Sequence, residues 1–131
     1  MYVSTGVEPQ RRRWDGIERK GVNVSQYVMI QSKSPWESGD VGQFYALARE
    51  LRQAGGEVTF FLVQNGVMAA RTGAKDPGLD QLLGANVKVL ADDFSLRERA
   101  IDATSLKNGV SPSAIDQVVD LLASGAKALW H

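Results

Sequence analysis

The 131-residue chain contains no cysteine. This absence excludes disulfide bonds, thiolate metal ligands and any thiol or persulfide chemistry carried by the polypeptide itself. Histidine is almost as scarce, because His131 is the only one. A serine nucleophile activated by histidine would need the last residue of the sequence as its base, so the sequence predicts no catalytic site of that kind.

Neither sign of charge is in excess, since the fifteen Lys and Arg residues are matched by fifteen Asp and Glu residues. A protein without a basic field has little attraction for nucleic acid, so no nucleic-acid partner is expected. The same balance removes the electrostatic repulsion between copies of a protein. It therefore favours self-association.

Long apolar runs and the common catalytic motifs are also missing. No segment approaches the roughly 18 apolar residues of a membrane span, and residues 1–20 lack the apolar centre of a secretory signal. We therefore expect a cytoplasmic protein with no membrane partner. The chain has no phosphate-binding loop, dinucleotide fingerprint or nucleophile elbow. No cofactor is therefore expected, and no motif supports enzymatic activity.

Residues 1–22 differ from the rest of the chain in charge, because they carry two more basic than acidic residues. The stretch RRRWDGIERKG within them shows neither a helical nor a strand period. We interpret residues 1–22 as a mobile or loosely docked N-terminal arm and residues 23–131 as one α/β domain. The arm is either a solvated tail or a basic tether for a partner, with Trp14 as its anchor.

Apolar runs and helical patterns alternate from Val24 onward. The runs typical of buried strands are QYVMIQS, EVTFFLVQ, NVKVLAD and KALWH. Helix starts are indicated between them at Asp40, Asn65, Asp76-Pro77, Ser95 and Ser111-Pro112. Strands that alternate with helices form a mainly parallel sheet with right-handed crossovers. The sequence therefore predicts a three-layer α/β/α sandwich with a mainly parallel sheet of about five strands.

Two of these helix starts carry the capping-box pattern, in which a small polar residue stands three positions before Glu or Gln. Asp40 precedes Gln43 in this way, and Ser95 precedes Glu98. In such a box the first side chain accepts a hydrogen bond from the backbone N–H of the second residue. The pattern therefore predicts Ser95 as the N-cap of its helix.

Polar loops follow three of the predicted strands. The stretch KVLADDFSLRERA runs from an apolar strand through two aspartates and a serine into a basic helical pattern. Ligand sites of parallel sheets lie beyond the carboxyl ends of the strands, where the direction of winding switches. We therefore expect loops 33–39, 64–66 and 92–95 to meet at one edge of the sheet.

The segments FFLVQNGVMAA and GANVKVLADDFSLRERAI and the ending LLASGAKALWH, taken with the order of elements, resemble the DsrE/DsrF/DsrH-like sulfur-relay family. The resemblance covers about residues 27–131. In that family one strand ends in a polar residue and glycine, and another ends at a cysteine before a basic helix that carries an arginine. Aligned on this pattern, the family's cysteine position falls on Ser95 and its basic residue on Arg99.

Members of the family that carry sulfur hold a persulfide on this thiol, which a serine cannot do. The resemblance therefore implies the partner-type subunits of such systems, some of which lack the cysteine and act through assembly. It further implies a homo-oligomer, either a trimer or a dimer of trimers, and cysteine-bearing homologues as further partners.

Five residues are candidates for binding a small ligand: Ser95, Asp93, Asn65, Trp36 and Arg99. A helix start at Ser95 offers free N–H groups and a positive dipole end to an anion, although the same serine also has an adequate role as a cap alone. The neighbouring aspartates repel an anion unless an arginine offsets them or a cation binds. As cation ligands they lack a third protein partner, so no metal site is predicted.

Three hypotheses of different classes follow. The first is a cysteine-free DsrE-like protein that is an assembly or accessory component of sulfur metabolism. The second is a small-ligand, anion-binding protein whose pocket lies at the carboxyl ends of the strands between Trp36, Asn65 and Ser95. The third is an enzyme whose motif is not recognised.

Overall fold

A computed structural model of the protein describes Tyr2–Ser4 and residues 24–131. These residues form one six-stranded sheet with the strand order β1-β6-β2-β3-β4-β5. The strands are β1 (Tyr2–Ser4), β2 (Gln26–Gln31), β3 (Glu57–Leu62), β4 (Lys88–Asp92), β5 (Val110–Ser113) and β6 (Lys127–Trp130). All neighbouring strands from β6 to β5 pair in parallel, and β1 pairs antiparallel with β6 at the edge.

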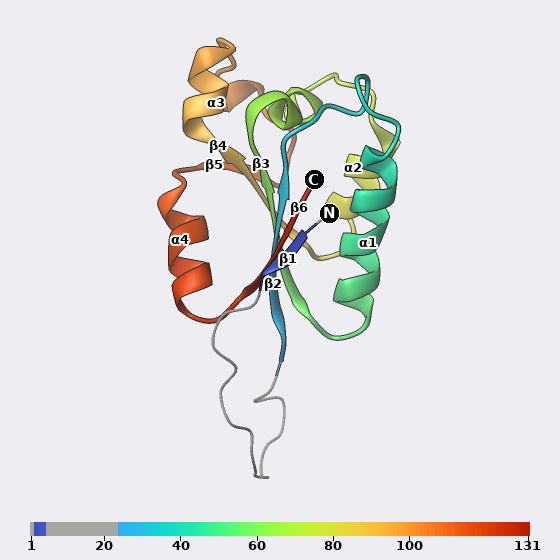
Figure 1. Ribbon diagram of the computed structural model, residues 1–131. Coiled ribbons are helices and arrows are strands. Elements are labelled where there is room, and N and C mark those ends of the chain that lie inside the picture. The colour runs from blue at the N-terminus through green and yellow to red at the C-terminus, as the bar shows by residue number, and fades with distance from the viewer. Residues whose placement is uncertain (1, 5–23) are drawn as a thin grey trace, which may run out of the picture.

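Helices cover both faces of this sheet. The α-helices are α1 (Val41–Gln53), α2 (Pro77–Leu83), α3 (Asp93–Glu98) and α4 (Asp116–Ala123), and the 3₁₀ segments are η1 (Gln64–Ala70) and η2 (Ala103–Ser105). Figure 1 shows α1 and α2 on one face and α4 on the opposite face. The predicted three-layer sandwich with five parallel strands is therefore confirmed, and β1 is an addition to it.

The two faces of the sheet carry cores of different size. Alternate residues of each strand point to opposite faces, so Phe60 packs toward α1 and α2 whereas its neighbour Phe61 packs toward α4. Among the described residues, 19 buried side chains form the first core and six form the second. The short helix α4 thus covers its face with much less buried apolar surface.

The direction of winding reverses at β2. The chain passes from β2 to β3, β4 and β5 on one side, and β6 then returns to the other side of β2. The topological switch point therefore lies between β2 and β6. His131, which follows β6, donates its backbone N–H to Ile30 O at 2.8 Å and so lies beside the end of β2.

One predicted helix start lies in a strand. Ser111 and Pro112 lie in the edge strand β5, where Pro112 is the register partner of Ala91, and α4 begins only at Asp116. Proline suits the first turn of a helix, which is why the pattern favoured one there. It is equally tolerated in an edge strand, because only one side of such a strand needs backbone hydrogen bonds.

The N-terminal region is described only in part. No strand is predicted before Val24, whereas the structure places β1 at Tyr2–Ser4 beside β6. Residues 5–23, and with them the suggested anchor Trp14, lie outside the described residues. The division into an arm and a domain therefore stays a prediction. Within the described part of the chain, no helix is both long and apolar enough to cross a membrane.

Candidate functional site

The first turn of α3 is capped by Asp92 and not, as predicted, by Ser95. Asp92 Oδ2 accepts hydrogen bonds from the backbone N–H of Ser95 at 3.0 Å and from its hydroxyl at 2.6 Å. Asp92 and Ser95 are both buried, with relative exposures of 6% and 2%. The helix therefore starts three residues earlier than the capping-box pattern suggests, because aspartate is as good an N-cap as serine.

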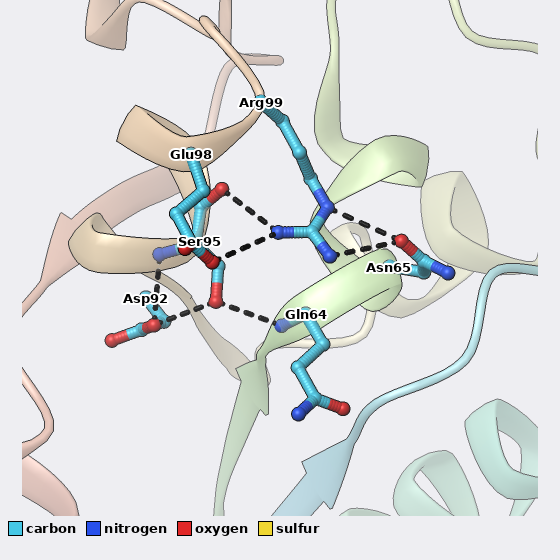
Figure 2. Close-up of polar contacts among 6 residues, drawn as sticks. All are labelled: Gln64, Asn65, Asp92, Ser95, Glu98 and Arg99. Carbon is cyan, nitrogen blue, oxygen red and sulfur yellow. Dashed lines mark hydrogen bonds and ion pairs between the residues drawn. The ribbon is translucent and has the colours of Figure 1, made fainter.

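The Ser95 hydroxyl also joins the ends of two strands. While it donates to Asp92, it accepts from the backbone N–H of Gln64 at 2.8 Å. Gln64 follows β3 and has a φ of 54°, a left-handed conformation that is uncommon for residues other than glycine. The hydroxyl thus fastens the loop after β3 to the first turn of α3 (Figure 2).

Arg99 closes this arrangement from the other end of α3. Its Nε and Nη2 atoms both donate to the side-chain oxygen of Asn65, at 3.2 and 3.0 Å, and its Nη1 donates to Ser95 O at 3.2 Å. The Glu98 carboxylate lies 3.9 Å from Nη1 and is more than half exposed. Figure 2 shows Arg99 reaching across from α3 to the segment that follows β3.

Asn65 connects Arg99 to the loop after β2. Its side-chain nitrogen donates to Glu37 Oε1 at 3.3 Å, and Glu37 Oε2 accepts from the backbone N–H of Ser34 at 2.7 Å. The amide of Asn65 therefore stands between a guanidinium and a carboxylate. Loops 33–39, 64–66 and 92–95 meet through these contacts, as expected from a parallel sheet.

The two remaining candidates, Trp36 and Asp93, adjoin Glu37 and Asp92 of this cluster in sequence. Trp36 is 55% exposed, and the Arg71 guanidinium lies 6.0 Å from the centre of its ring. The Asp93 carboxylate lies 3.8 Å from Arg97. A role for Trp36 or Asp93 in ligand binding stays a prediction, as it does for Ser95, Asn65 and Arg99.

Three residues lie together at the switch point, and no pattern in the sequence predicts that they meet. Gln31 is fully buried, and its Oε1 lies 3.1 Å from His131 Nδ1. His131 Nε2 in turn lies 3.6 Å from Asp40 Oδ2. Asp40 is the N-cap residue of α1 as predicted, but its side chain makes no capping hydrogen bond. Only the pairing of β2 with β6, which no local pattern contains, brings Gln31 and His131 together.

The described residues contain no group of three or more His, Cys, Asp or Glu side chains that could hold a metal ion.

The fold and the site together define a class: a parallel α/β/α protein with a thiol-free polar cluster at the carboxyl ends of its strands. The chain belongs to the DsrE/DsrF-like family, whose model matches residues 25–130. No match was found among curated proteins.

Solved structures share this fold. The ychN protein from E. coli superposes with a TM-score of 0.75 at 22% identity, covering 82% of this chain and 100% of its own. MTH1491 from Methanobacterium thermoautotrophicum, described as a protein of unknown function, has a TM-score of 0.70 at 18% identity, covering 83% of this chain and 100% of its own. At these identities the likeness establishes the fold alone.

Proposed function

We propose that this protein is an assembly or accessory component of a sulfur-relay system and does not carry sulfur itself. The observation that supports this most directly is the state of Ser95, the position that the family resemblance assigns to the cysteine. Its hydroxyl is 2% exposed and is engaged by both Asp92 and the Gln64 backbone. The position therefore serves to hold the fold together, and the chain offers no thiol elsewhere.

Assembly is supported by apolar side chains that the described residues leave uncovered. Ile115, Val119 and Leu122 follow one another at four- and three-residue spacing along α4, with exposures of 50%, 57% and 36%. We call these three residues the α4 stripe. Moving apolar side chains of this size out of water lowers the free energy, so a row of them favours contact with another protein surface. The proposal is a homo-oligomer, a trimer or hexamer, located in the cytoplasm.

Sedimentation velocity at micromolar concentration tests the assembly. We expect species larger than the 14.3 kDa chain. Val119→Glu, which puts a charge in the α4 stripe, should shift the distribution toward the monomer. Gln117→Glu adds the same charge at an exposed position of α4 outside the stripe and should leave it unchanged. A wild type that sediments only as a monomer would contradict self-assembly.

The accessory role needs a separate measurement. A cysteine-bearing DsrE-like protein from the same organism would be loaded from a persulfide donor with and without this chain. We expect a change in the loading rate that depends on the α4 stripe, and no sulfur on this chain itself. An unchanged loading rate over a range of ratios would argue against the accessory role even if the chain is an oligomer.

A second candidate function, binding of a small anion, is supported by the setting of Arg99. Two of its donors share the single neutral oxygen of Asn65. A guanidinium binds more strongly to two charged oxygens in a bidentate pair. Gln64, which precedes Asn65, and Ala100, which follows Arg99, both have a φ of 54°. Backbone strain of this kind clusters at binding sites.

Thermal unfolding in sulfate, thiosulfate and phosphate tests this candidate. An anion that replaces Asn65 as the acceptor should raise the unfolding temperature of the wild type. The rise should disappear in Arg99→Met and remain in Arg97→Met, which removes a nearby exposed arginine. Equal shifts in all three proteins would mean that the anions act nonspecifically.

A further inference from the structure

The switch point between β2 and β6 holds a histidine whose tautomer the fold determines. Gln31 donates from Nε2 to Lys33 O at 2.9 Å, which leaves its Oε1 facing His131 Nδ1 at 3.1 Å. An amide oxygen only accepts hydrogen bonds, so Nδ1 must carry a proton. Gln31 is fully buried and its amide has a partner at each end, so this arrangement favours the neutral tautomer with the proton on Nδ1.

The opposite nitrogen of the ring faces a carboxylate. His131 Nε2 lies 3.6 Å from Asp40 Oδ2, and the ring packs against Phe44 with 5.3 Å between the ring centres. In the neutral imidazole Nε2 presents a lone pair to Asp40, which is unfavourable. When Nε2 is protonated, the same contact becomes an ion pair. Among the described residues, Asp40 is the charged side chain that pairs with this ring.

The two ends of one loop are attached to this histidine and its amide partner. The loop 33–39 begins at Lys33, whose carbonyl is bound by Gln31, and leads into Asp40, which faces His131. Between these points Glu37 reaches Asn65 at 3.3 Å and thus the Arg99 cluster. The ring is therefore linked to both ends of the loop whose Glu37 contacts the cluster.

We propose that His131 is a proton-operated latch for loop 33–39. With Nε2 protonated, the imidazolium attracts Asp40 and holds the loop so that Glu37 stays within hydrogen-bond distance of Asn65. Loss of that proton replaces attraction by repulsion and loosens the loop, so the contact between Glu37 and Asn65 weakens as pH rises. Histidine is the side chain whose charge ordinarily changes between pH 5 and 8. The inference goes beyond the proposed function, because it applies whatever partner or ligand the cluster serves.

Hydrogen exchange of the full chain across pH 5 to 8, corrected for the intrinsic rate at each pH, tests the latch. The relevant amides are those of Ser34, Glu37 and Ser38, which form hydrogen bonds within the loop. Their protection should fall by about twofold to fivefold as pH rises, the range expected for an exposed ion pair. Asp40→Asn and His131→Gln should each remove this pH dependence.

Asp116→Asn, which removes a carboxylate in the first turn of α4, is the matched control and should keep the pH dependence of the wild type. Nitrogen chemical shifts of the His131 ring provide an independent check, since the neutral ring should carry its proton on Nδ1. Loop protection that is the same in wild type and Asp40→Asn at every pH would overturn the proposal. So would a neutral ring that carries its proton on Nε2.

Discussion

Asp92 and Ser95 form the closest polar contact of the cluster, since one carboxylate oxygen accepts both the hydroxyl proton of Ser95 at 2.6 Å and its backbone N–H at 3.0 Å. The adjacent Asp93 takes no part in this contact and lies near Arg97. Two neighbouring aspartates at the end of β4 therefore have different roles, one inside the fold and one at its surface.

Replacement of each aspartate by alanine should separate these roles. Asp92→Ala leaves the N–H and O–H of the buried Ser95 without their acceptor, and should lower the free energy of unfolding by about 1–3 kcal/mol. Asp93→Ala changes a residue whose side chain is 42% exposed and should alter it by no more than about 0.5 kcal/mol. Denaturant titration measures both values. Equal effects of the two substitutions would contradict the assignment of Asp92 as the cap.

A cysteine at position 95 should be a poor nucleophile. It would be buried like Ser95, beside the Asp92 carboxylate, and both conditions disfavour the thiolate. Each unit by which its pKa rises reduces the thiolate about tenfold. Phe94→Cys is the matched control, because Phe94 is the preceding residue of α3 and is 56% exposed. Alkylation by a maleimide should therefore be at least about tenfold slower for Ser95→Cys.

The same pair of variants addresses sulfur transfer. If Ser95→Cys accepts sulfur from a persulfide donor as fast as Phe94→Cys, position 95 retains a usable carrier geometry, and its purely structural role would be refuted. Adding Asp92→Asn to Ser95→Cys should accelerate alkylation, since it removes the negative charge next to the sulfur.

Two glycines should respond in opposite directions to alanine. A Cβ at Gly66 would overlap the backbone oxygen of Gln31, so the loop after β3 would have to move away from the end of β2. We expect a loss of about 1–3 kcal/mol in unfolding free energy. At Gly42 in α1 a Cβ meets nothing within 4 Å, and alanine should stabilise by about 0.5–1 kcal/mol. Thermal unfolding of both variants checks these signs.

Tyr45 should make the stability sensitive to alkaline pH. Its hydroxyl donates to Asp76 Oδ2 at 2.8 Å, and burial, aided by that carboxylate, raises the pKa of Tyr45 well above its ordinary value. The folded chain therefore keeps a proton that the unfolded chain loses near pH 10. The resulting stabilisation is complete below about pH 10 and declines as pH rises further.

Unfolding free energies measured from pH 8 to pH 11 check this prediction. Tyr45→Phe should be less stable at pH 8, because the buried Asp76 loses its donor, and should show a weaker decline toward pH 11. Tyr27→Phe, at a half-buried tyrosine, should decline as the wild type does. A decline in Tyr45→Phe as steep as in the wild type would show that other groups cause it.

The sequence contains enough local information for most strands and helices but not for the contacts that build the site. Strand runs such as EVTFFLVQ are dense in β-branched and aromatic residues, and β3 forms there. At the start of α3, Asp92, Asp93 and Ser95 are all good capping residues within four positions, which leaves the local pattern ambiguous. Burial of the Asp92 carboxylate resolves it, and burial is a property of the tertiary fold.

Contacts between distant segments were beyond any local pattern. The hydrogen bond from Gln64 N to Ser95 Oγ spans 31 residues, and the contact between Gln31 and His131 spans 100. The first could be anticipated in outline, because loops after neighbouring parallel strands meet. The second depends on β6 returning to pair with β2. The spacing of apolar residues along the sequence does not determine the order of the strands in the sheet.

Pro112 in β5 has a consequence for how copies of this protein can meet. A strand at the rim of a sheet is a template on which another chain can continue the hydrogen-bonded ladder, and proline in such a strand is one of the devices that interrupt this growth. At the opposite rim, β1 pairs over only three residues. In the part of the chain that the structure describes, neither rim thus provides a long uninterrupted template. Association through the helical faces is therefore favoured over fibre-like stacking of sheets end to end.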